Sequence, residues 1–383
     1  MEVALHELGE IFTGNTPSKK NKNYWNSEDT VFIKPNDLNN NNLLLNDKNN
    51  EYISKEALAQ ARIVGRNSIL VTCIGTIGKI AITTDAKTAF NQQINAIVPN
   101  KNVYTKYLAY ALMHYKPRLA ALANAPVVPI INKKQFSNFK INLNLDKEIQ
   151  YTVIRQLDLV GEIIKNKNRQ LSKLDELIKA RFVEMFGDPQ DSKSKWKKST
   201  IEKCCTLKSG KTLPRNIENE GGNIPYVKVK DMNSLENMTY ITTSTRFVSD
   251  KTANKNIFPV GTVIFPKRGG AIGTNKKRLT KVPICADLNI MGVIPDNTRI
   301  NSYYLFEYFN MVDLNTLNNG SSVPQINNKD INPLNINIPP LSLQNEFANF
   351  VQQVDKSKFE NIVYLNKTLS SKILSQLGDA IRD

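Results

Sequence analysis

The segment Gly65–Val71 (GRNSILV) returns 194 residues later as Pro259–Phe265 (PVGTVIF), and Gly75–Gly78 (GTIG) returns as Gly270–Gly273 (GAIG). In both copies, a run of aliphatic and β-branched residues leads into a glycine turn and then into a second such run. This is the pattern of strand, turn and strand. The 383-residue chain is therefore expected to fold as a duplication.

The duplication covers almost the whole chain at an offset of about 194 to 196 residues. Four further pairs of segments match in the same order: Thr13–Pro17 with Ser209–Thr212, Phe32–Leu38 with Tyr226–Met232, Ile94–Pro99 with Ile290–Pro295, and Val128–Asn132 with Val323–Asn327. Short β-branched runs and one amphipathic helix in each copy predict two mixed α/β globules. Thr105 and Ser302 are the predicted N-caps of these helices, because a hydroxyl accepts amide protons of a first turn.

After each globule the hydrophobic pattern becomes helical. From Glu148 to Phe186 apolar residues recur every seven positions, which is typical of a coiled-coil seam. The seam comprises Leu157, Ile164, Leu171, Ile178 and Met185, with Val160 and Leu174 on the same stripe. The second stretch has looser spacing and carries Val351, Val354, Phe359, Ile362, Leu365, Leu369, Ile373 and Leu377. We expect helix core at these positions, and contact with a partner protein along the two helices.

Two polar residues and one stop signal refine the first helix. Lys167 and Arg181 interrupt the seam, which suggests that a partner covers that edge. The helix is predicted to end at Gly187-Asp188-Pro189, since glycine and then proline commonly follow a helix C-terminus. Together these patterns divide the chain into a globule (1–147), a helix (148–187), a second globule (188–341) and a second helix (342–383).

Charge distinguishes the globules from the helices. The chain carries a formal charge of +16. The globules account for +7 and +8 of it, whereas the helices carry +1 and 0. Such a balance indicates a polyanionic partner for the globules, although composition alone does not separate nucleic acid from a membrane surface. The nearly neutral helices are expected to meet protein.

This organisation suggests a molecular ruler. A helix of about 38 residues is roughly 57 Å long at 1.5 Å per residue. If the two helices pair antiparallel, the globules lie at opposite ends and would touch DNA at half-sites about one helical turn, ~34–36 Å, apart. Because the globules differ in sequence, the two half-sites should differ as well.

Several stretches resemble the specificity subunits of type I restriction–modification systems, and the resemblance covers essentially the whole chain. Its most specific part is Leu174–Pro189 (LDELIKARFVEMFGDP), followed by Trp196. Gly65–Lys79, the two Val-Pro segments and Ile338–Gln344 are similar to the family as well. The resemblance implies an α+β fold in which two α/β target-recognition domains, related by a pseudo-two-fold internal repeat, are separated by two long antiparallel coiled-coil helices.

The resemblance also implies the partners. It places the chain in a complex with double-stranded DNA and two adenine-methylating modification subunits, joined when needed by motor and nuclease subunits. Those partners would supply the S-adenosylmethionine chemistry and the ATP hydrolysis. The chain itself is then expected to need no cofactor, to hold no metal and to be no enzyme. A stand-alone DNA-binding regulator or architectural protein is the alternative.

The candidate DNA-binding residues lie at two kinds of place in each globule. Glycine loops let the backbone approach a phosphate, and cations beside them add to the attraction. Lysine or asparagine where a strand meets a loop is placed to reach base edges. The first kind comprises Gly75, Gly78, Lys79, Lys267, Arg268, Lys276, Lys277 and Arg278, and the second Lys34, Asn36, Lys228 and Lys230. The competing interpretation is a tight hairpin with solvated surface lysines.

Other chemistries find little support. Lys208–Thr212 (KSGKT) looks like the end of a P-loop, but Cys205 stands where the motif requires glycine, and Pro214 disfavours the following helix. We find no methyltransferase or nuclease motif, and two histidines offer little for a metal or nucleophilic site. The four cysteines form no CxxC pair, so reduced, partly buried thiols are expected. Without a secretion signal or a membrane-spanning stretch, a cytoplasmic protein is expected.

Overall fold

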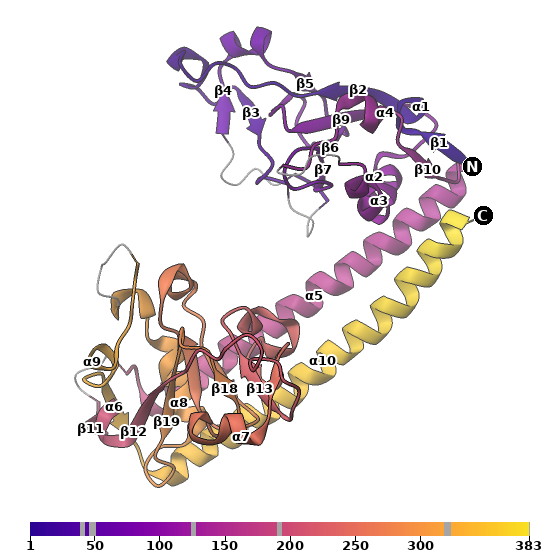
Figure 1. The fold of residues 1–383 in the computed structure, drawn as a ribbon. Helices are drawn as coiled ribbons and strands as arrows, with labels where there is room; N and C mark the ends of the chain where they lie inside the picture. Colours follow the sequence, from indigo (N-terminus) through magenta and orange to yellow (C-terminus); the bar gives the residue numbers. More distant parts are fainter. Residues whose placement is uncertain (39–42, 46–50, 124–127, 190–193, 318–322, 383) are drawn as a thin grey trace. The chain divides into compact units, whose positions relative to one another are not determined.

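The computed structural model describes residues 1–38, 43–45, 51–123, 128–189, 194–317 and 323–382, with the side chains of Lys255 and of residues 364–382 left undescribed. The chain forms two compact units. The first comprises Met1–Asn166 with Tyr364–Asp383, and the second comprises Lys167–Val363. Two long helices, α5 (Lys147–Phe186) and α10 (Leu341–Arg382), each contribute to both units (Figure 1).

The first unit contains two four-stranded sheets and a two-stranded ladder. One sheet is antiparallel and has the order β2 (Gly9–Thr13), β9 (Ile94–Pro99), β6 (Ile69–Thr72), β7 (Ile80–Ile82). The other has the order β4 (Glu51–Ile53), β3 (Thr30–Ile33), β8 (Thr88–Phe90), β5 (Ile63–Val64), with β3 and β8 parallel. The ladder pairs β1 (Glu2–Ala4) with β10 (Lys140–Asn142). The short helices of the first unit are α1 (Leu5–Leu8), α2 (Thr105–His114), α3 (Lys116–Ala121) and α4 (Lys133–Ser137). Its 3-10 turns are η1 (Lys22–Tyr24) and η2 (Lys55–Gln60).

The second unit repeats this plan with one strand more in its main sheet and one fewer in its smaller sheet. Its main sheet has the order β12 (Cys205–Ser209), β19 (Ile290–Pro295), β16 (Val263–Pro266), β17 (Arg278–Thr280), β14 (Tyr240–Ile241). Its smaller sheet has the order β15 (Phe247–Val248), β13 (Ile224–Val227), β18 (Cys285–Ala286), and β11 (Lys197–Thr200) pairs with β20 (Asn335–Ile338). Its short helices are α6 (Ile201–Cys204), α7 (Asp250–Ala253), α8 (Ser302–Met311) and α9 (Asn328–Ile331). Its 3-10 turns are η3 (Asp231–Asn233), η4 (Leu235–Asn237), η5 (Asn254–Asn256), η6 (Gly269–Thr274) and η7 (Leu314–Leu317).

The predicted duplication is confirmed strand by strand. The β2-β9-β6-β7 order returns as β12-β19-β16-β17, and the parallel pair β3–β8 returns as β13–β18. Gly14 and Gly210 end equivalent strands. A Cβ at either glycine would lie 2.3 or 2.1 Å from a backbone carbonyl oxygen, that of Asn91 or Asp287. The glycine in the P-loop-like segment Lys208–Thr212 therefore serves close backbone packing that its counterpart in the first unit also requires.

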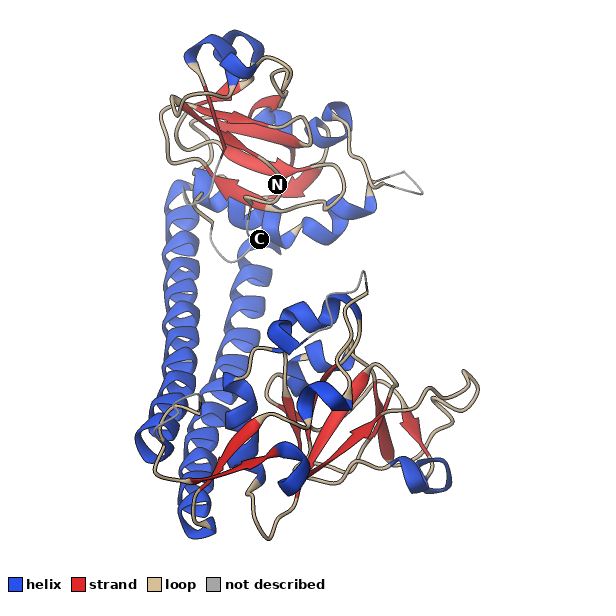
Figure 2. Ribbon diagram, turned by 90° about the vertical axis from the view of Figure 1, so that its left-hand side faces the viewer, coloured by secondary structure: helices blue, strands red, loops and turns tan. Residues whose placement is uncertain are grey.

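Each main sheet lies between a helix and the smaller sheet (Figure 2). Successive side chains of a strand point to opposite faces. In β6, Ile69 and Val71 accordingly pack with α2 and its neighbours, whereas Leu70 packs with β3 and β8. In β16, Val263 and Phe265 belong to the core with α8, whereas Ile264 packs against β13 and β18. The layered core thus fixes where β3 and β13 end, which matters for the site described below.

In the second unit α5 and α10 run antiparallel, as three polar contacts show. Arg181 Nη2 lies 3.1 Å from Glu346 Oε1, Lys358 Nζ donates to Asp175 Oδ1 at 2.5 Å, and Lys167 Nζ donates to Asn361 Oδ1 at 2.8 Å. Residue numbers rise along one helix while they fall along the other. Helix α10 thus supplies a polar contact for each of the two residues that interrupt the seam, Lys167 and Arg181.

The apolar seam residues differ in burial. Ile178 and Val351 are buried in the second unit's core, Met185 packs against that core, and Leu157 packs against the core of the first unit. Ile164 and Leu171 are half-buried, and Ile362 is 43% exposed. Leu369 and Ile373 lie outside the described side chains.

Helix ends were predicted with mixed success. Helix α5 ends at Phe186 and is followed by Gly187 with φ of 79°, as expected for a glycine that terminates a helix. The predicted caps Thr105 and Ser302 are wrong by one residue, since both are the first helical residue. Tyr104 and Asn301 occupy the N-cap positions, and the Asn301 side chain accepts from the Tyr303 amide. In the described part of the chain, no helix combines the length and apolar character needed to span a membrane.

Candidate nucleic-acid interface

The residue directly after the equivalent strands β3 and β13 is a lysine in both units. The amide N–H of Lys34 donates to Asp37 Oδ2 at 2.7 Å, and that of Lys228 donates to Asp231 Oδ2 at 2.8 Å. Each aspartate thereby fixes the turn that ends its strand. Two lysines are thus held at matching places by matching local structure.

In the first unit, the Lys34 ammonium forms an ion pair with Glu51 Oε1. Glu51 begins β4, which pairs with β3 and places Glu51 opposite Phe32. Lys19 approaches the second carboxylate oxygen, Oε2, at 3.6 Å and lies over the Trp25 ring. One carboxylate is therefore flanked by two ammonium groups.

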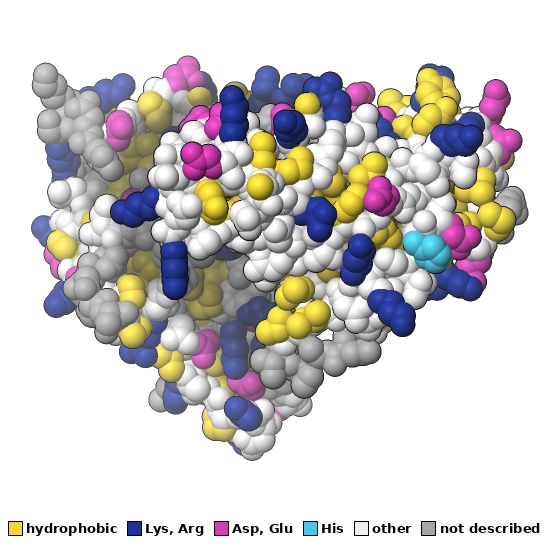
Figure 3. Space-filling model, turned by 90° about the horizontal axis from the view of Figure 1, so that it is seen from above, with side chains coloured by type: hydrophobic (Ala, Val, Ile, Leu, Met, Phe, Trp, Pro, Cys, Tyr) yellow, Lys and Arg dark blue, Asp and Glu magenta, His cyan; other side chains and the backbone are white. Residues whose placement is uncertain are grey.

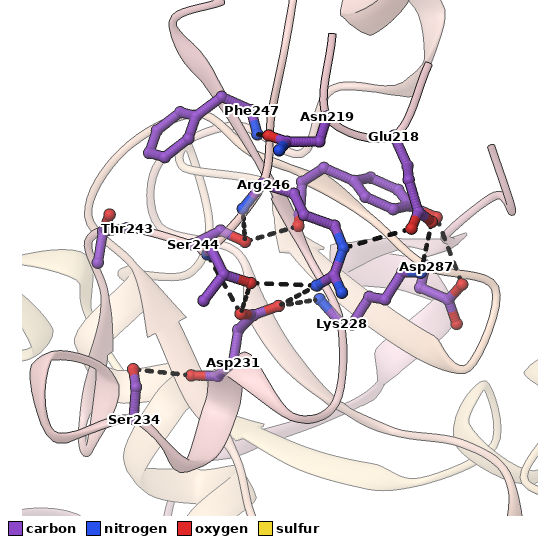
Figure 4. Close-up of polar contacts among 12 residues, drawn as sticks. Glu218, Asn219, Lys228, Asp231, Ser234, Thr243, Ser244, Arg246, Phe247 and Asp287 are labelled. Atoms are coloured by element: carbon purple, nitrogen blue, oxygen red, sulfur yellow. Dashed lines mark hydrogen bonds and ion pairs between the residues drawn. The ribbon is translucent and has the colours of Figure 1, made fainter. Parts of the chain in front are cut away.

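In the second unit, Lys228 Nζ donates to Glu218 Oε2 at 2.5 Å, and Arg246 Nε lies 3.4 Å from Glu218 Oε1 (Figure 4). The Arg246 guanidinium extends between Glu218 and Asp231, and Arg246 Nη1 lies 4.0 Å from Asp231 Oδ2. Asp231 is buried and also accepts a hydrogen bond from Thr245 Oγ1 at 2.9 Å. Again a carboxylate is flanked by two cations, but here the whole cluster is tied to a buried aspartate.

Both flanked carboxylates keep their negative charge at neutral pH. Burial acts to raise the pKa of Glu51, but the hydrogen bond and charge of Lys34, with Lys19, outweigh it and hold that pKa below its ordinary value. The hydrogen bond from Lys228, aided by Arg246, lowers the pKa of Glu218 against a smaller effect of burial. Both glutamates are therefore acceptors only, beside lysines that are donors only.

The glycine loops are pinned by the Val-Pro segments in both units. Gly75 N–H donates to the Pro129 carbonyl at 2.9 Å, and Gly269 N–H donates to the Pro324 carbonyl at 2.8 Å. Both glycines have positive φ, 76° and 70°. Gly75 is therefore the structural counterpart of Gly269, which corrects the sequence match of Gly75 with Gly270 by one residue.

The predicted backbone donors of the first loop are used inside the fold. Gly78 N–H donates to the Thr72 carbonyl at 2.8 Å, and Lys79 N–H donates to Thr72 Oγ1 at 2.9 Å. At Gly78, with φ of 76°, a Cβ would lie 2.8 Å from Lys116 Cγ. These observations favour the tight-hairpin interpretation for the glycines themselves.

The side chain of Lys79 joins the loop to the strand end. Its Nζ donates to the carbonyl of Pro35 at 3.2 Å, next to the exposed Asn36. In the second unit, Lys276 Nζ donates to Asn233 Oδ1 and so connects the loop after η6 to η3. Within each unit, the glycine loop therefore lies beside the segment that follows β3 or β13. We call this region the strand-end edge of the unit.

Three cations of the second loop are built into the protein interior. Lys267 is 9% exposed, and its Nζ donates to Ser209 Oγ at 2.7 Å. Lys277 is 4% exposed and donates to the Val312 carbonyl at 2.6 Å, while burial lowers its pKa to about 8. Arg278 is 7% exposed and donates to the carbonyls of Asn237, Lys277 and Met232. We therefore assign Lys267, Lys277 and Arg278 to the fold.

The other cations predicted to bind DNA are exposed or half-buried. Arg268 and Lys230 are exposed and Lys276 is half-buried, as Lys34, Lys79 and Lys228 are. On the face drawn in Figure 3, Lys and Arg side chains are dispersed among acidic and uncharged groups rather than gathered into one patch.

Sequence reasoning missed the carboxylates and Arg246. Asp37 and Asp231 were within the matched segments and could have been found from the repeat. Glu51 and Glu218 could not, because Glu51 follows its lysine by 17 residues whereas Glu218 precedes its lysine by 10. In both units a carboxylate pairs with the equivalent lysine, but it comes from non-equivalent segments.

The family comparison gives this geometry its context. Residues 1–176 and 193–370 match the model of a family described as type I restriction modification DNA specificity domain. The chain belongs to the type I restriction–modification DNA specificity family. It is a specificity subunit of that kind, and its role is to recognise a DNA sequence.

Curated relatives support the membership along the chain. The MjaIX specificity subunit of Methanocaldococcus jannaschii is 24% identical over 404 aligned positions, covering 98% of this chain and 90% of that protein. The HindI specificity subunit of Haemophilus influenzae is 29% identical over 188 positions, covering 47% of this chain and 40% of that one.

Solved structures of the family share the fold. The type I specificity subunit from M. genitalium aligns over 100% of this chain and 96% of its own, with a TM-score of 0.54 and 15% identity. A chain from a study of complex assembly and conformational transition of the type I R-M system aligns over 98% and 95%, with a TM-score of 0.56 and 15% identity. The mixed α/β specificity-subunit fold is thereby confirmed.

Proposed function

We propose that this specificity subunit reads an asymmetric, bipartite DNA site, one half with each unit, and positions two adenine-methylating modification subunits on it. The observation that carries the proposal is an arrangement found in both units. In each, a strand is followed by a lysine beside a glycine loop, but different side chains surround that lysine. The backbone amides of Lys34 and Lys228 donate to equivalent aspartates, yet the side chains around the two lysines differ. Equivalent placement supports two half-sites, and different neighbours support different sequences in them.

The two long helices are proposed to set the distance between the half-sites. Helix α5 is continuous over 40 residues, roughly 60 Å at 1.5 Å per residue. Its antiparallel contacts with α10 in the second unit support a stiff connection. The segments 1–147 and 188–341 are proposed as the two target-recognition domains, and 148–187 and 342–383 as the spacer helices.

The helices also offer surface for the modification subunits. Tyr151 and Leu159 on α5 are 56% and 59% exposed, and Phe359 on α10 is 68% exposed. Contiguous patches of exposed apolar side chains, rather than single ones, commonly mark a protein interface. We propose that the modification subunits cover these residues together with Ile362, and that catalysis and cofactors reside in those partners. The complex would act in the cytoplasm, with motor and nuclease subunits joining when restriction is required.

Co-expression with a modification subunit tests this function. The complex should methylate adenine in one two-part motif with an unread spacer, as detected by sequencing of modified bases across the genome. The chain alone should methylate nothing and bind DNA weakly. Tight, specific binding by the chain alone, with no complex formed on mixing and no methylated motif, would instead identify a stand-alone DNA-binding regulator.

A further inference from the structure

The paired lysine and glutamate in each unit form a donor and an acceptor side by side. An ammonium group has three donors and an ionised carboxylate has about four acceptor sites. The Lys34–Glu51 and Lys228–Glu218 pairs each use few of these. Each pair therefore retains capacity for a ligand that offers an acceptor next to a donor.

The first unit contains a carboxylate oxygen in need of a donor. Glu51 Oε2 is enclosed, and among the described residues it accepts no hydrogen bond. Lys19 lies 3.6 Å from it, beyond ordinary hydrogen-bond distance. The Glu51 side chain as a whole is 42% exposed and that of Lys34 is 33% exposed. A ligand can consequently reach the pair, and a small rotation of the carboxylate would present the unused oxygen to it.

The second unit holds its pair more rigidly. Glu218 is 16% exposed and Lys228 is 30% exposed. Arg246 bridges Glu218 to the buried Asp231, as Figure 4 shows, so the carboxylate cannot swing away without breaking its contacts with Arg246 and Lys228. A fixed carboxylate beside a fixed ammonium discriminates between ligands better than two free side chains do.

Base-pair edges in the major groove differ in how they arrange donors and acceptors. A G·C pair presents the two guanine acceptors, N7 and O6, and then the cytosine N4 donor. An A·T pair presents its donor between two acceptors, beside the thymine methyl group. An ammonium next to a carboxylate matches the G·C edge, whereas on A·T the carboxylate would face an acceptor on one side.

We propose that each strand-end pair reads one G·C base pair, Lys34 with Glu51 in one half-site and Lys228 with Glu218 in the other. The lysine donates to guanine and the glutamate accepts from cytosine N4. Arg246 and Lys19 are positioning residues that hold the carboxylate. This proposal rests on the proposed function and adds to it the acidic residues that determine one position of each half-site.

The test compares the methylated motifs of complexes carrying Glu218→Met, Glu51→Met or no change. Methionine keeps much of the length of glutamate but offers no charged acceptor. Each variant should relax one G·C position in one half-site, with discrimination at that base pair falling roughly ten- to hundredfold. The other half-site should stay intact in each variant, which shows that the protein has folded and assembled. Glu202→Met, at an exposed position on α6, is the matched control and should leave the motif unchanged.

The outcomes separate this inference from the function on which it rests. If the unchanged complex methylates no two-part motif, the proposed function fails. If it methylates one and the variants leave both half-sites as they were, or relax an A·T position, only the inference fails. If a variant complex methylates nothing, its binding affinity is measured for a series of duplexes that each differ from the site at one base pair. A flattened preference at a single G·C pair supports the inference, and an equal loss on all duplexes contradicts it.

Discussion

At the scale of single residues, the duplication is most visible where atoms approach most closely. Gly14 and Gly210 share a place at which a Cβ would collide with backbone on the neighbouring segment. Gly161, in contrast, lies on α5 with nothing within 4 Å of an added Cβ. Close packing therefore requires glycine at Gly14 and Gly210, but not at Gly161.

Alanine substitution should reveal the difference. Gly210→Ala should lower the free energy of unfolding by about 1–3 kcal/mol, because the backbone near Asp287 must shift. Gly161→Ala should raise it by about 0.5–1 kcal/mol, because alanine favours the helix interior. Urea denaturation of the two variants beside the unchanged chain measures both. Equal effects would show that the close approach at Gly210 is not tight.

Lys277 supplies a pH-dependent test of burial. Its pKa is lowered by burial to about 8, from an ordinary value of 10.5. Below pH 8 the folded state bears the cost of a buried charge. Between pH 8 and 10.5 the unfolded chain holds a proton that the folded chain has released, so stability rises with pH. Relative to Lys277→Met, the free energy of unfolding should therefore rise by up to about 3 kcal/mol over this range. A flat difference between the two proteins from pH 7 to 10.5 would contradict the assignment.

At the scale of elements, one buried glutamine fastens each long helix to its globule. Gln150 Oε1 accepts from the Tyr104 amide, and Gln344 Oε1 accepts from the Asn301 amide, both at 2.8 Å. The Gln344 Nε2 group donates to the carbonyls of Arg299 and Pro339. Both glutamines are fully buried. The side chain of Gln150 therefore joins the N-terminus of α2 to the start of α5. The side chain of Gln344 joins the N-terminus of α8 to the start of α10.

Gln344→Leu should destabilise the chain strongly, by about 2–5 kcal/mol, because three backbone groups lose their partner, one of them buried and two partly buried. Gln352→Leu, at an exposed position on the same helix, should change stability by less than about 0.5 kcal/mol. Thermal or urea unfolding of both variants checks this. A similar small effect of both would mean that water replaces the lost hydrogen bonds at residue 344.

Elements were easier to predict than the contacts between them. Strands and long helices follow from periodicity, so the repeat, the α/β class and the end of α5 were evident in the sequence. The burial of Lys277 and Arg278 was not evident, because a Lys-Lys-Arg run has the composition of a solvated loop. Only the structure shows the backbone carbonyls that accept hydrogen bonds from these two side chains. Glu51 and Glu218 escaped detection for another reason. They meet equivalent lysines from non-equivalent segments, which alignment of the repeat cannot show.

At the scale of the whole molecule, two globules of similar plan and positive charge are joined by nearly neutral helices. Family membership assigns DNA sequence recognition to the chain. We infer that duplication gave two reading edges, that divergence around Lys34 and Lys228 made them different, and that the helices set the spacing between their targets.

The spacing of the methylated motif tests this central claim most directly. A four-residue helical insertion in the middle of α5, matched by one at the same level of α10, lengthens the helices by about 6 Å, roughly two base pairs at ~3.4 Å each. Sequencing of modified bases from cells that express the complex should show an unread spacer longer by about one or two base pairs, with both half-sites unchanged. An unchanged spacer beside retained methylation would contradict the account.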